Sequence, residues 1–171
     1  MDQTDTAIRA IIKSLSDTVA PALPEADPLA REQLRLALDF LAFLRLRLPD
    51  LHQRERAELR HQIALANGIA AVGALGKHAE AMTDFCRCAE ALAADPGAGT
   101  GAIRDMAMDL AFAVAGVVQT LCDQSTETAS RVRQTVLDET ARKVELDRFW
   151  YAPIGFEPSP LDQSRLRDLL Q

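Results

Sequence analysis

The chain lacks the segments that mark membrane-spanning and exported proteins. Its longest uninterrupted apolar run, 110–118, is far shorter than the roughly 20 residues that a helix needs to cross a bilayer. The first residues form neither the basic nor the apolar region of a signal peptide. The three cysteines are an odd number, which suits reduced thiols better than a disulfide framework. These absences predict a cytoplasmic protein that does not associate with membranes.

Positive charge and catalytic motifs are scarce as well. The net charge of −6 and the pI near 5.1 argue against nucleic acid as a partner. No Gly-x-Ser-x-Gly nucleophile motif occurs, and the glycine-rich stretch 97–101 matches neither a phosphate-binding loop nor a dinucleotide fingerprint. The sequence therefore assigns no catalytic residue and no cofactor.

No segment alternates apolar and polar residues as a β-strand does, and proline and glycine divide the chain into helix-length segments. We predict an all-α fold, an antiparallel helical bundle of five to seven helices within a single domain. Residues 1–148 would form the bundle, and residues 149–171 an aromatic turn and a short last helix packing on the bundle or on a partner subunit. Whether the chain breaks at Gly73–Gly76 and at Asp123–Thr126 is open at this stage.

The second predicted helix, from 28 to 48, is apolar around most of its circumference. Arg31, Arg35 and Asp39 recur every four residues and mark a narrow hydrated strip, whereas Phe40 and Phe43 belong to the apolar remainder. A helix with so wide an apolar surface is either central in the fold or packed on a partner as well as on the core. We predict a homodimer, with a further protein partner as an additional possibility.

Half of the aromatic residues lie between positions 149 and 156, where Pro153 and Gly155 shape a turn. Large aromatic side chains on such a turn are expected to be buried against something. The segment is a clasp that closes the bundle, a lid over a pocket, or an arm exchanged between subunits. The candidate ligand or partner contacts are Phe149, Trp150, Tyr151 and Phe156, together with Phe40 and Phe43.

Two groups of residues have spacings that could suit a metal ion. Glu58 and His61 form a Glu-x-x-His pair, but a carboxylate-bridged di-iron site needs a second such pair, and the chain has none. His78, Met82 and Cys86 follow at four-residue spacing and could suit a soft ion. Ordinary core packing explains the second group better, so no metal site is assigned.

A polar strip is predicted along the helix that begins near residue 102. Asp105 and Asp109 project in line with Gly116, Thr120 and Asp123, which favours a solvent-exposed face over an acid–base pair. We therefore expect a non-catalytic interaction or assembly protein. The alternative is a bundle or enzyme that binds a small apolar ligand near Trp150 and Tyr151. A metal-binding protein of ferritin-like design comes third.

Overall fold

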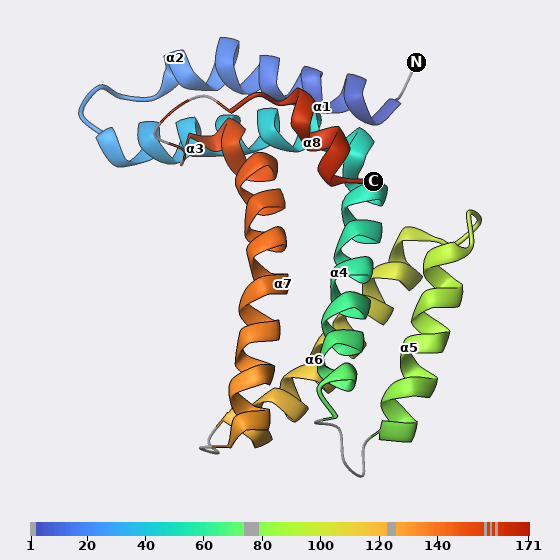
Figure 1. Cartoon of the computed structure of the whole chain (residues 1–171). Helices are drawn as coiled ribbons and strands as arrows, with labels where there is room; N and C mark the ends of the chain where they lie inside the picture. The colour runs from blue at the N-terminus through green and yellow to red at the C-terminus, as the bar shows by residue number, and fades with distance from the viewer. Residues whose placement is uncertain (1–2, 74–78, 123–125, 156, 158, 160) are drawn as a thin grey trace. The chain divides into compact units, whose positions relative to one another are not determined.

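The computed structural model describes residues 3–73, 79–122, 126–155, 157, 159 and 161–171. These residues form helices joined by turns and irregular segments, with no strand among them, so the predicted all-α class is confirmed. The chain divides into two compact units (Figure 1). Unit 1 comprises residues 1–51 and 150–161, and unit 2 comprises residues 52–149 and 162–171.

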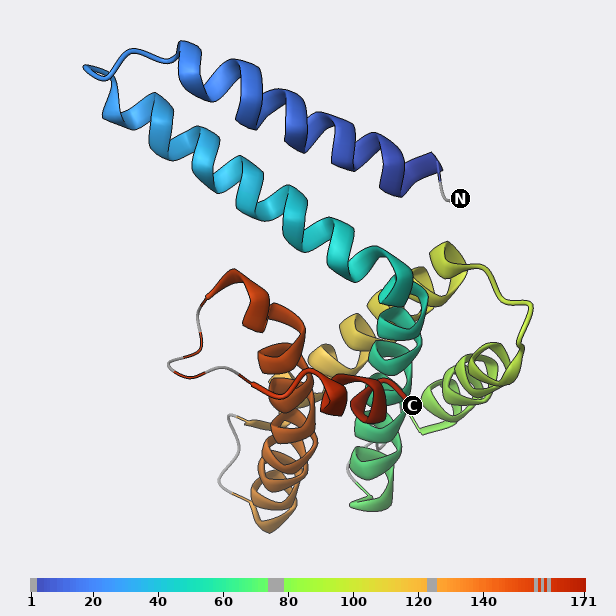
Figure 2. The same ribbon diagram turned by 90° about the horizontal axis from the view of Figure 1, so that it is seen from above.

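Unit 1 is built on a helical hairpin. Its first arm runs through α1 (Gln3–Ser14), a π-helical turn (Leu15–Val19) and α2 (Ala20–Ala22), and its second arm is α3 (Pro28–Arg47). The Asp27 Oδ1 atom accepts a hydrogen bond of 3.0 Å from the Ala30 amide, and Pro28 follows as the first helical residue, as the sequence predicted. Because Arg45 pairs with Asp5 at 2.6 Å, the two arms run antiparallel (Figure 2).

The C-terminal part of unit 1 adds the predicted aromatic turn. The last two residues of α7 (Glu127–Tyr151) lead into a 3₁₀ turn (Ala152–Ile154), which ends at Gly155 with a φ of +84°. Only glycine adopts that backbone conformation without strain, so the sequence places the bend where the chain requires it. A second 3₁₀ turn (Leu48–Asp50) follows α3.

Unit 2 holds the main hydrophobic core. It contains α4 (Leu51–Ala71) from His52 onward, α5 (Ala79–Ala94), α6 (Thr100–Cys122), α7 as far as Phe149, and α8 (Ser164–Leu169). Ion pairs join α4 to α7 in reverse order along the two helices, so these helices are antiparallel. The largest fully buried side chains are Leu59, Ile69, Ile103, Leu110 and Val132.

The sequence left open whether a helix is interrupted at Gly73–Gly76 and at Asp123–Thr126, and both places adjoin residues that the structure does not describe. Helix α4 ends at Ala71, Gly73 follows with a φ of +73°, and α5 begins at Ala79. Helices α6 and α7 are likewise separate, ending at Cys122 and beginning at Glu127. Residues 74–78 and 123–125 themselves are not described.

Helices α4 and α7 approach each other closely at Gly68. A β-carbon placed there would lie 2.7 Å from Cγ2 of Thr135, which is closer than van der Waals contact allows. A glycine in the middle of a helix costs about 0.5–1 kcal/mol relative to alanine. The close approach of the two helices explains why glycine stands at this position.

Three arginines donate hydrogen bonds to the backbone at helix C-termini. In unit 1, Arg47 Nε lies 2.8 Å from the Trp150 carbonyl oxygen. In unit 2, Arg60 Nη2 lies 2.6 Å from the Leu170 oxygen, and Arg56 donates to the carbonyls of Ala93 and Asp95. The last carbonyls of a helix lack intrahelical donors and carry partial negative charge, which suits a guanidinium.

Candidate interaction surfaces

The predicted aromatic contacts of unit 1 form one cluster. The ring of Phe43 stacks on Tyr151 at 5.7 Å between centroids, meets Trp150 edge-on at 6.5 Å and lies 6.0 Å from Phe40. The guanidinium of Arg47 lies over the Trp150 ring, 5.3 Å from its centre. These four candidate residues lie together although Phe40 and Phe43 are more than one hundred positions from Trp150 and Tyr151, and their role as ligand or partner contacts stays a prediction.

The remaining two aromatic candidates lie elsewhere. Phe149 belongs to unit 2, where its ring is buried and the guanidinium of Arg165 lies 5.7 Å from its centre. Phe156 falls outside the described residues. The structure thus gives Phe149 a packing role, while Phe40 and Tyr151 remain exposed at the edge of the cluster.

An exposed apolar surface continues from the aromatic cluster along α3. We call this surface the α3 stripe and define it by Leu29, Leu36, Phe40 and Leu44. The four residues share one side of the helix by their spacing, and Leu29 and Phe40 expose 69% and 54% of their surface. The charged residues lie on another side, where Arg35 pairs with Glu32 and with Asp39 at 2.6 Å each. The predicted hydrated strip is confirmed, and the apolar remainder of α3 is only partly covered.

Trp150 does not line the cavity that unit 1 offers. That cavity, of about 170 Å³, lies in the hairpin and is lined by Ala20, Leu23, Arg31, Leu34, Arg35 and Leu38. The indole is instead buried against Phe43 and Arg47. A ligand site near Trp150 and Tyr151 stays a prediction.

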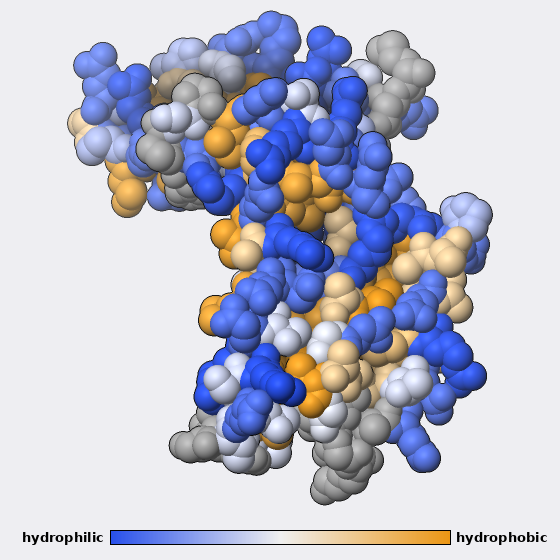
Figure 3. Space-filling model, viewed as in Figure 1, coloured by the Kyte–Doolittle hydropathy of each residue, from blue (hydrophilic) through white to orange (hydrophobic). Residues whose placement is uncertain are grey.

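Glu58 lies in a network of charged side chains between α4 and α7. Its carboxylate accepts from Gln62 at 2.9 Å, and it pairs with Lys143 at 2.9 Å and with Arg54 at 3.2 Å. Asp147 completes the network through Arg54 and through Lys143 at 3.1 Å. In Figure 3, hydrophilic side chains cover most of α4 and α7 on the face turned to the viewer, with hydrophobic ones between them. The carboxylate that a metal would need is thus held by cations.

The network fixes the protonation of its members. Burial alone would raise the pKa of Glu58, but the hydrogen bonds from Gln62 and Lys143 and the charges of Lys143 and Arg54 outweigh it and lower the pKa. Burial lowers the pKa of His61, against the opposing charge of Glu58. His61 lines a cavity of about 370 Å³ between α4, α7 and α8, together with Arg60 and Lys143. Glu58 is therefore ionised and His61 neutral near pH 7.

Met82 and Cys86 are core residues of unit 2. Both are buried in the hydrophobic cluster, as the ordinary reading of their spacing predicted. Burial, with a smaller contribution from the charge of Glu90, raises the pKa of the Cys86 thiol and disfavours the thiolate that binds metals. His78 falls outside the described residues. Within the described ranges, no three His, Cys, Asp or Glu side chains converge as metal ligands.

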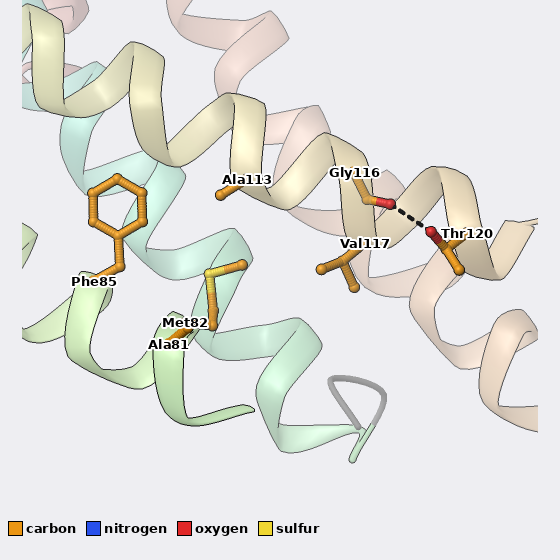
Figure 4. Close-up of a pocket in the computed structure, with 7 residues that line it drawn as sticks. All are labelled: Ala81, Met82, Phe85, Ala113, Gly116, Val117 and Thr120. Atoms are coloured by element: carbon orange, nitrogen blue, oxygen red, sulfur yellow. Dashed lines mark hydrogen bonds between the residues drawn. The ribbon is translucent and has the colours of Figure 1, made fainter. Parts of the chain in front are cut away.

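An apolar groove opens between α5 and α6, and the sequence did not predict it. We call it the α5–α6 groove. It encloses about 340 Å³ and is lined by Ala81, Met82, Phe85, Ala113, Gly116, Val117 and Thr120 (Figure 4). The Thr120 hydroxyl donates to the Gly116 carbonyl at 2.8 Å, so the one polar side chain of the lining has an acceptor within α6.

The outer face of α6 carries the predicted polar strip and two large apolar residues. Asp105, Asp109, Gly116 and Thr120 are exposed, as expected, whereas Asp123 falls outside the described residues. Met108 and Phe112 are exposed as well, Phe112 by 83% of its surface. Phe112 lies one helical turn before Gly116, and the sequence analysis missed it because a single phenylalanine beside a polar strip has no distinctive spacing.

Comparisons with known proteins give no relative on which to base a function. No family model, no curated protein and no solved structure matches the chain. No described helix is both long enough and apolar enough to cross a bilayer. The two exposed apolar surfaces, the α3 stripe and the α5–α6 groove, therefore provide the main indications of function.

Proposed function

We propose that the protein is a non-catalytic interaction or assembly protein that forms a homodimer through the helical hairpin of unit 1. The observation that carries this proposal is the poor burial of the hairpin. Neither α1 nor α2 has a buried residue, and α3 has only Phe43 and Arg47. Short helices in water depend on tertiary packing of an apolar face, and a hairpin alone supplies little of it.

A second copy would supply the missing packing. The exposed large apolar residues of unit 1 are Ile11, Val19, Leu29, Leu36, Phe40, Leu44, Leu46 and Tyr151. Covering the exposed half of one such side chain contributes about 1 kcal/mol, because full burial contributes about 1.5–3 kcal/mol. In a two-fold symmetric dimer each residue of the interface occurs twice, so the α3 stripe would contribute eight side chains. Together they would contribute about 8 kcal/mol of burial free energy before the costs of association.

The composition of the α3 stripe also suits an interface. The four residues of the stripe are all apolar, and Glu32, Arg35 and Asp39 of α3 pair with one another on a separate side. The centres of interfaces are poor in charged residues and rich in aromatic ones. The stripe matches this composition through Phe40, and Tyr151 of the same aromatic cluster adds a second exposed ring. Two hairpins packed in this way form a four-helix bundle, a common architecture for helical dimers.

The test is the oligomeric state of the full chain, measured by analytical ultracentrifugation across the micromolar range. We expect a dimer for the unchanged protein and a monomer for Leu36→Glu combined with Phe40→Glu, because a carboxylate cannot be buried unpaired. Leu137→Glu is the matched control, since Leu137 is an exposed leucine of α7 in unit 2. Circular dichroism should show equal helicity in all three proteins. A monomeric unchanged protein, or a dimer that survives both glutamates, would refute the proposal.

Location in the cytoplasm and the absence of a nucleic-acid partner stay predictions from the sequence. A small-ligand site at Trp150 is a separate prediction, and fluorescence measures it directly because the chain has a single tryptophan. An apolar ligand that saturably shifts the emission of Trp150 would support that alternative. An unchanged spectrum would leave the interaction role as the better supported one.

A further inference from the structure

We infer that the α5–α6 groove is a docking site for an amphipathic helix of another protein, one with bulky apolar residues on one face and lysine or arginine beside them. The inference goes beyond the proposed dimer, because it concerns a different surface and a different partner.

The floor of the groove suits aliphatic side chains from a helix. Met82 and Val117 form a buried apolar floor and Phe85 is partly exposed beside them; in Figure 4 Met82 and Phe85 come from α5 and Val117 from α6. The volume of about 340 Å³ is near the lower end of the ~300–1,000 Å³ typical of ligand pockets. Methionine adapts its shape to varied partners. A helix that presents residues at i, i+3 or i+4 uses such a groove by inserting these residues.

Among the described residues, nothing packs against the position that a side chain at Gly116 would take. A β-carbon added at Gly116 would meet nothing within 4 Å, whereas one at Gly68 would collide with Thr135. Glycine within a helix costs about 0.5–1 kcal/mol, and at Gly116 no contact inside the described part of the chain explains this cost. With Ala81 and Ala113 also lining the groove, the walls are low, and the backbone of an external helix can come close.

Exposed apolar residues extend the groove along α6. Phe112 lies one turn before Gly116, and Met108 lies one turn before Phe112, so the three positions are neighbours on the surface of the helix. Both side chains are more than 60% exposed. A docking helix that filled the groove would therefore find further apolar surface beside it, and large exposed apolar residues beside a groove are typical of interaction sites.

The carboxylates of α5 and α6 near the groove favour a partner with basic residues. Near the groove, Glu80 and Asp84 are exposed beside the α5 lining and Asp109 lies one turn before Ala113 of α6, with Asp105 a further turn away. Glu90 is turned toward α4, where it accepts a hydrogen bond from Asn67 at 3.1 Å. The two arginines of α5 and α6 are already engaged, because Arg87 pairs with Asp84 at 2.6 Å and Arg104 pairs with Glu55 of α4 at 2.8 Å. The surface thus has an excess of negative charge, and so does the whole chain at −6. A second copy is disfavoured as the occupant, and a helix with basic residues beside its apolar face is complementary.

Two synthetic peptides test the inference. Both have the same leucines at i, i+3, i+4 and i+7, with lysine at the remaining surface positions of one and glutamate at those of the other. Fluorescence anisotropy of each labelled peptide is followed as the full-length protein is added. We expect saturable binding of the lysine peptide, weakened by salt, and no binding of the glutamate peptide. Equal binding of both peptides, or binding of neither, would overturn the inference.

Two glycine variants locate the binding. Gly116→Leu adds a side chain to the groove at a position where a β-carbon meets nothing within 4 Å, and we expect it to weaken binding of the lysine peptide about tenfold or more. Gly101→Leu is the matched control, because a β-carbon at Gly101 also meets nothing within 4 Å but Gly101 lies in the first turn of α6, outside the lining. Equal affinities of Gly116→Leu and Gly101→Leu would show that the peptide binds elsewhere and would overturn the inference.

Two further double variants test whether charge contributes to peptide binding and whether binding is independent of the α3 stripe. Asp105→Asn combined with Asp109→Asn should weaken the lysine peptide about threefold to tenfold and reduce its salt dependence. The Leu36→Glu and Phe40→Glu protein should bind the peptide as the unchanged protein does, because these residues lie in unit 1. Loss of binding with those glutamates would mean that the peptide occupies the α3 stripe instead, which would overturn the inference while leaving the dimer proposal to its own test.

Discussion

Unit 2 contains nearly all of the buried hydrophobic side chains of the described chain, whereas unit 1 contains only Phe43 and Trp150. Most of the large hydrophobic residues that remain exposed belong to unit 1. Helix α3 of unit 1 is itself rich in leucine and phenylalanine, so a shortage of apolar residues does not explain the difference. A helix becomes buried only when other helices surround it, and a hairpin has too few. The comparison shows that unit 2 holds the buried core and that unit 1 leaves most of its large apolar side chains exposed, which the proposed dimer would cover.

The largest expected effect contrasts one leucine from each unit. Leu59 is 0% exposed at the centre of unit 2, and Leu59→Ala should lower the free energy of unfolding by about 3 kcal/mol, through lost burial and the cavity left behind. Leu41 of α3 is only partly buried, so Leu41→Ala should cost about 1 kcal/mol. Urea unfolding followed by circular dichroism gives both values. Equal losses would mean that the hairpin is as tightly packed as the bundle.

Arg47 tests how firmly the aromatic cluster of unit 1 is held. Arg47→Met keeps the apolar part of the side chain but removes the hydrogen bond to the Trp150 carbonyl and the charge beneath its ring. We expect a loss of about 1.5–3 kcal/mol and a red shift of Trp150 emission. Arg45→Met is the control, because its exposed pair with Asp5 should contribute less than about 1 kcal/mol. An unshifted emission spectrum would show that Arg47 does not hold the indole in place.

Gly68 tests the tight packing of unit 2. Gly68→Ala introduces a β-carbon that collides with Thr135, so we expect a loss of about 1–2 kcal/mol despite the better helix propensity of alanine. Thr135→Ala in the same protein should recover most of that loss, which a double-mutant cycle measures. Gly116→Ala should instead be neutral or slightly stabilising. If Gly68→Ala were as harmless as Gly116→Ala, the helices α4 and α7 would have room to separate.

The smallest expected effect is a pH dependence confined to unit 2. The pKa of His61 is lower in the folded protein, so its contribution to stability is present above its unfolded value near 6.5 and is lost as the pH falls towards the folded value. The lowered pKa of Glu58 adds a second loss below about pH 4.3. His61→Gln should remove the first loss and leave the second, as unfolding measured from pH 7 down to about pH 3 will show. A first loss that persists in His61→Gln would assign it to another group.

The sequence was sufficient for the helical class and for most helix ends, because proline, glycine and capping residues act locally. Asp27 with Pro28 starts α3, and Gly155 bends the aromatic turn. The contact between Phe43 and Trp150 was not predictable, since these residues meet only through the fold, and the role of the aromatic candidates as ligand or partner contacts stays a prediction. Phe112 and the α5–α6 groove were not predictable, because a groove is the space that two helices leave uncovered, and no residue pattern records it.

The bonds from Arg47, Arg56 and Arg60 to helix C-termini have a consequence for how this sequence can change over generations. Their acceptors are backbone carbonyls, which every amino acid possesses. Substitutions at Ala93 or Leu170 therefore leave these acceptors in place, while replacement of an arginine removes its bond at once. Among relatives of this chain, we expect the donor positions to remain arginine while the acceptor positions drift.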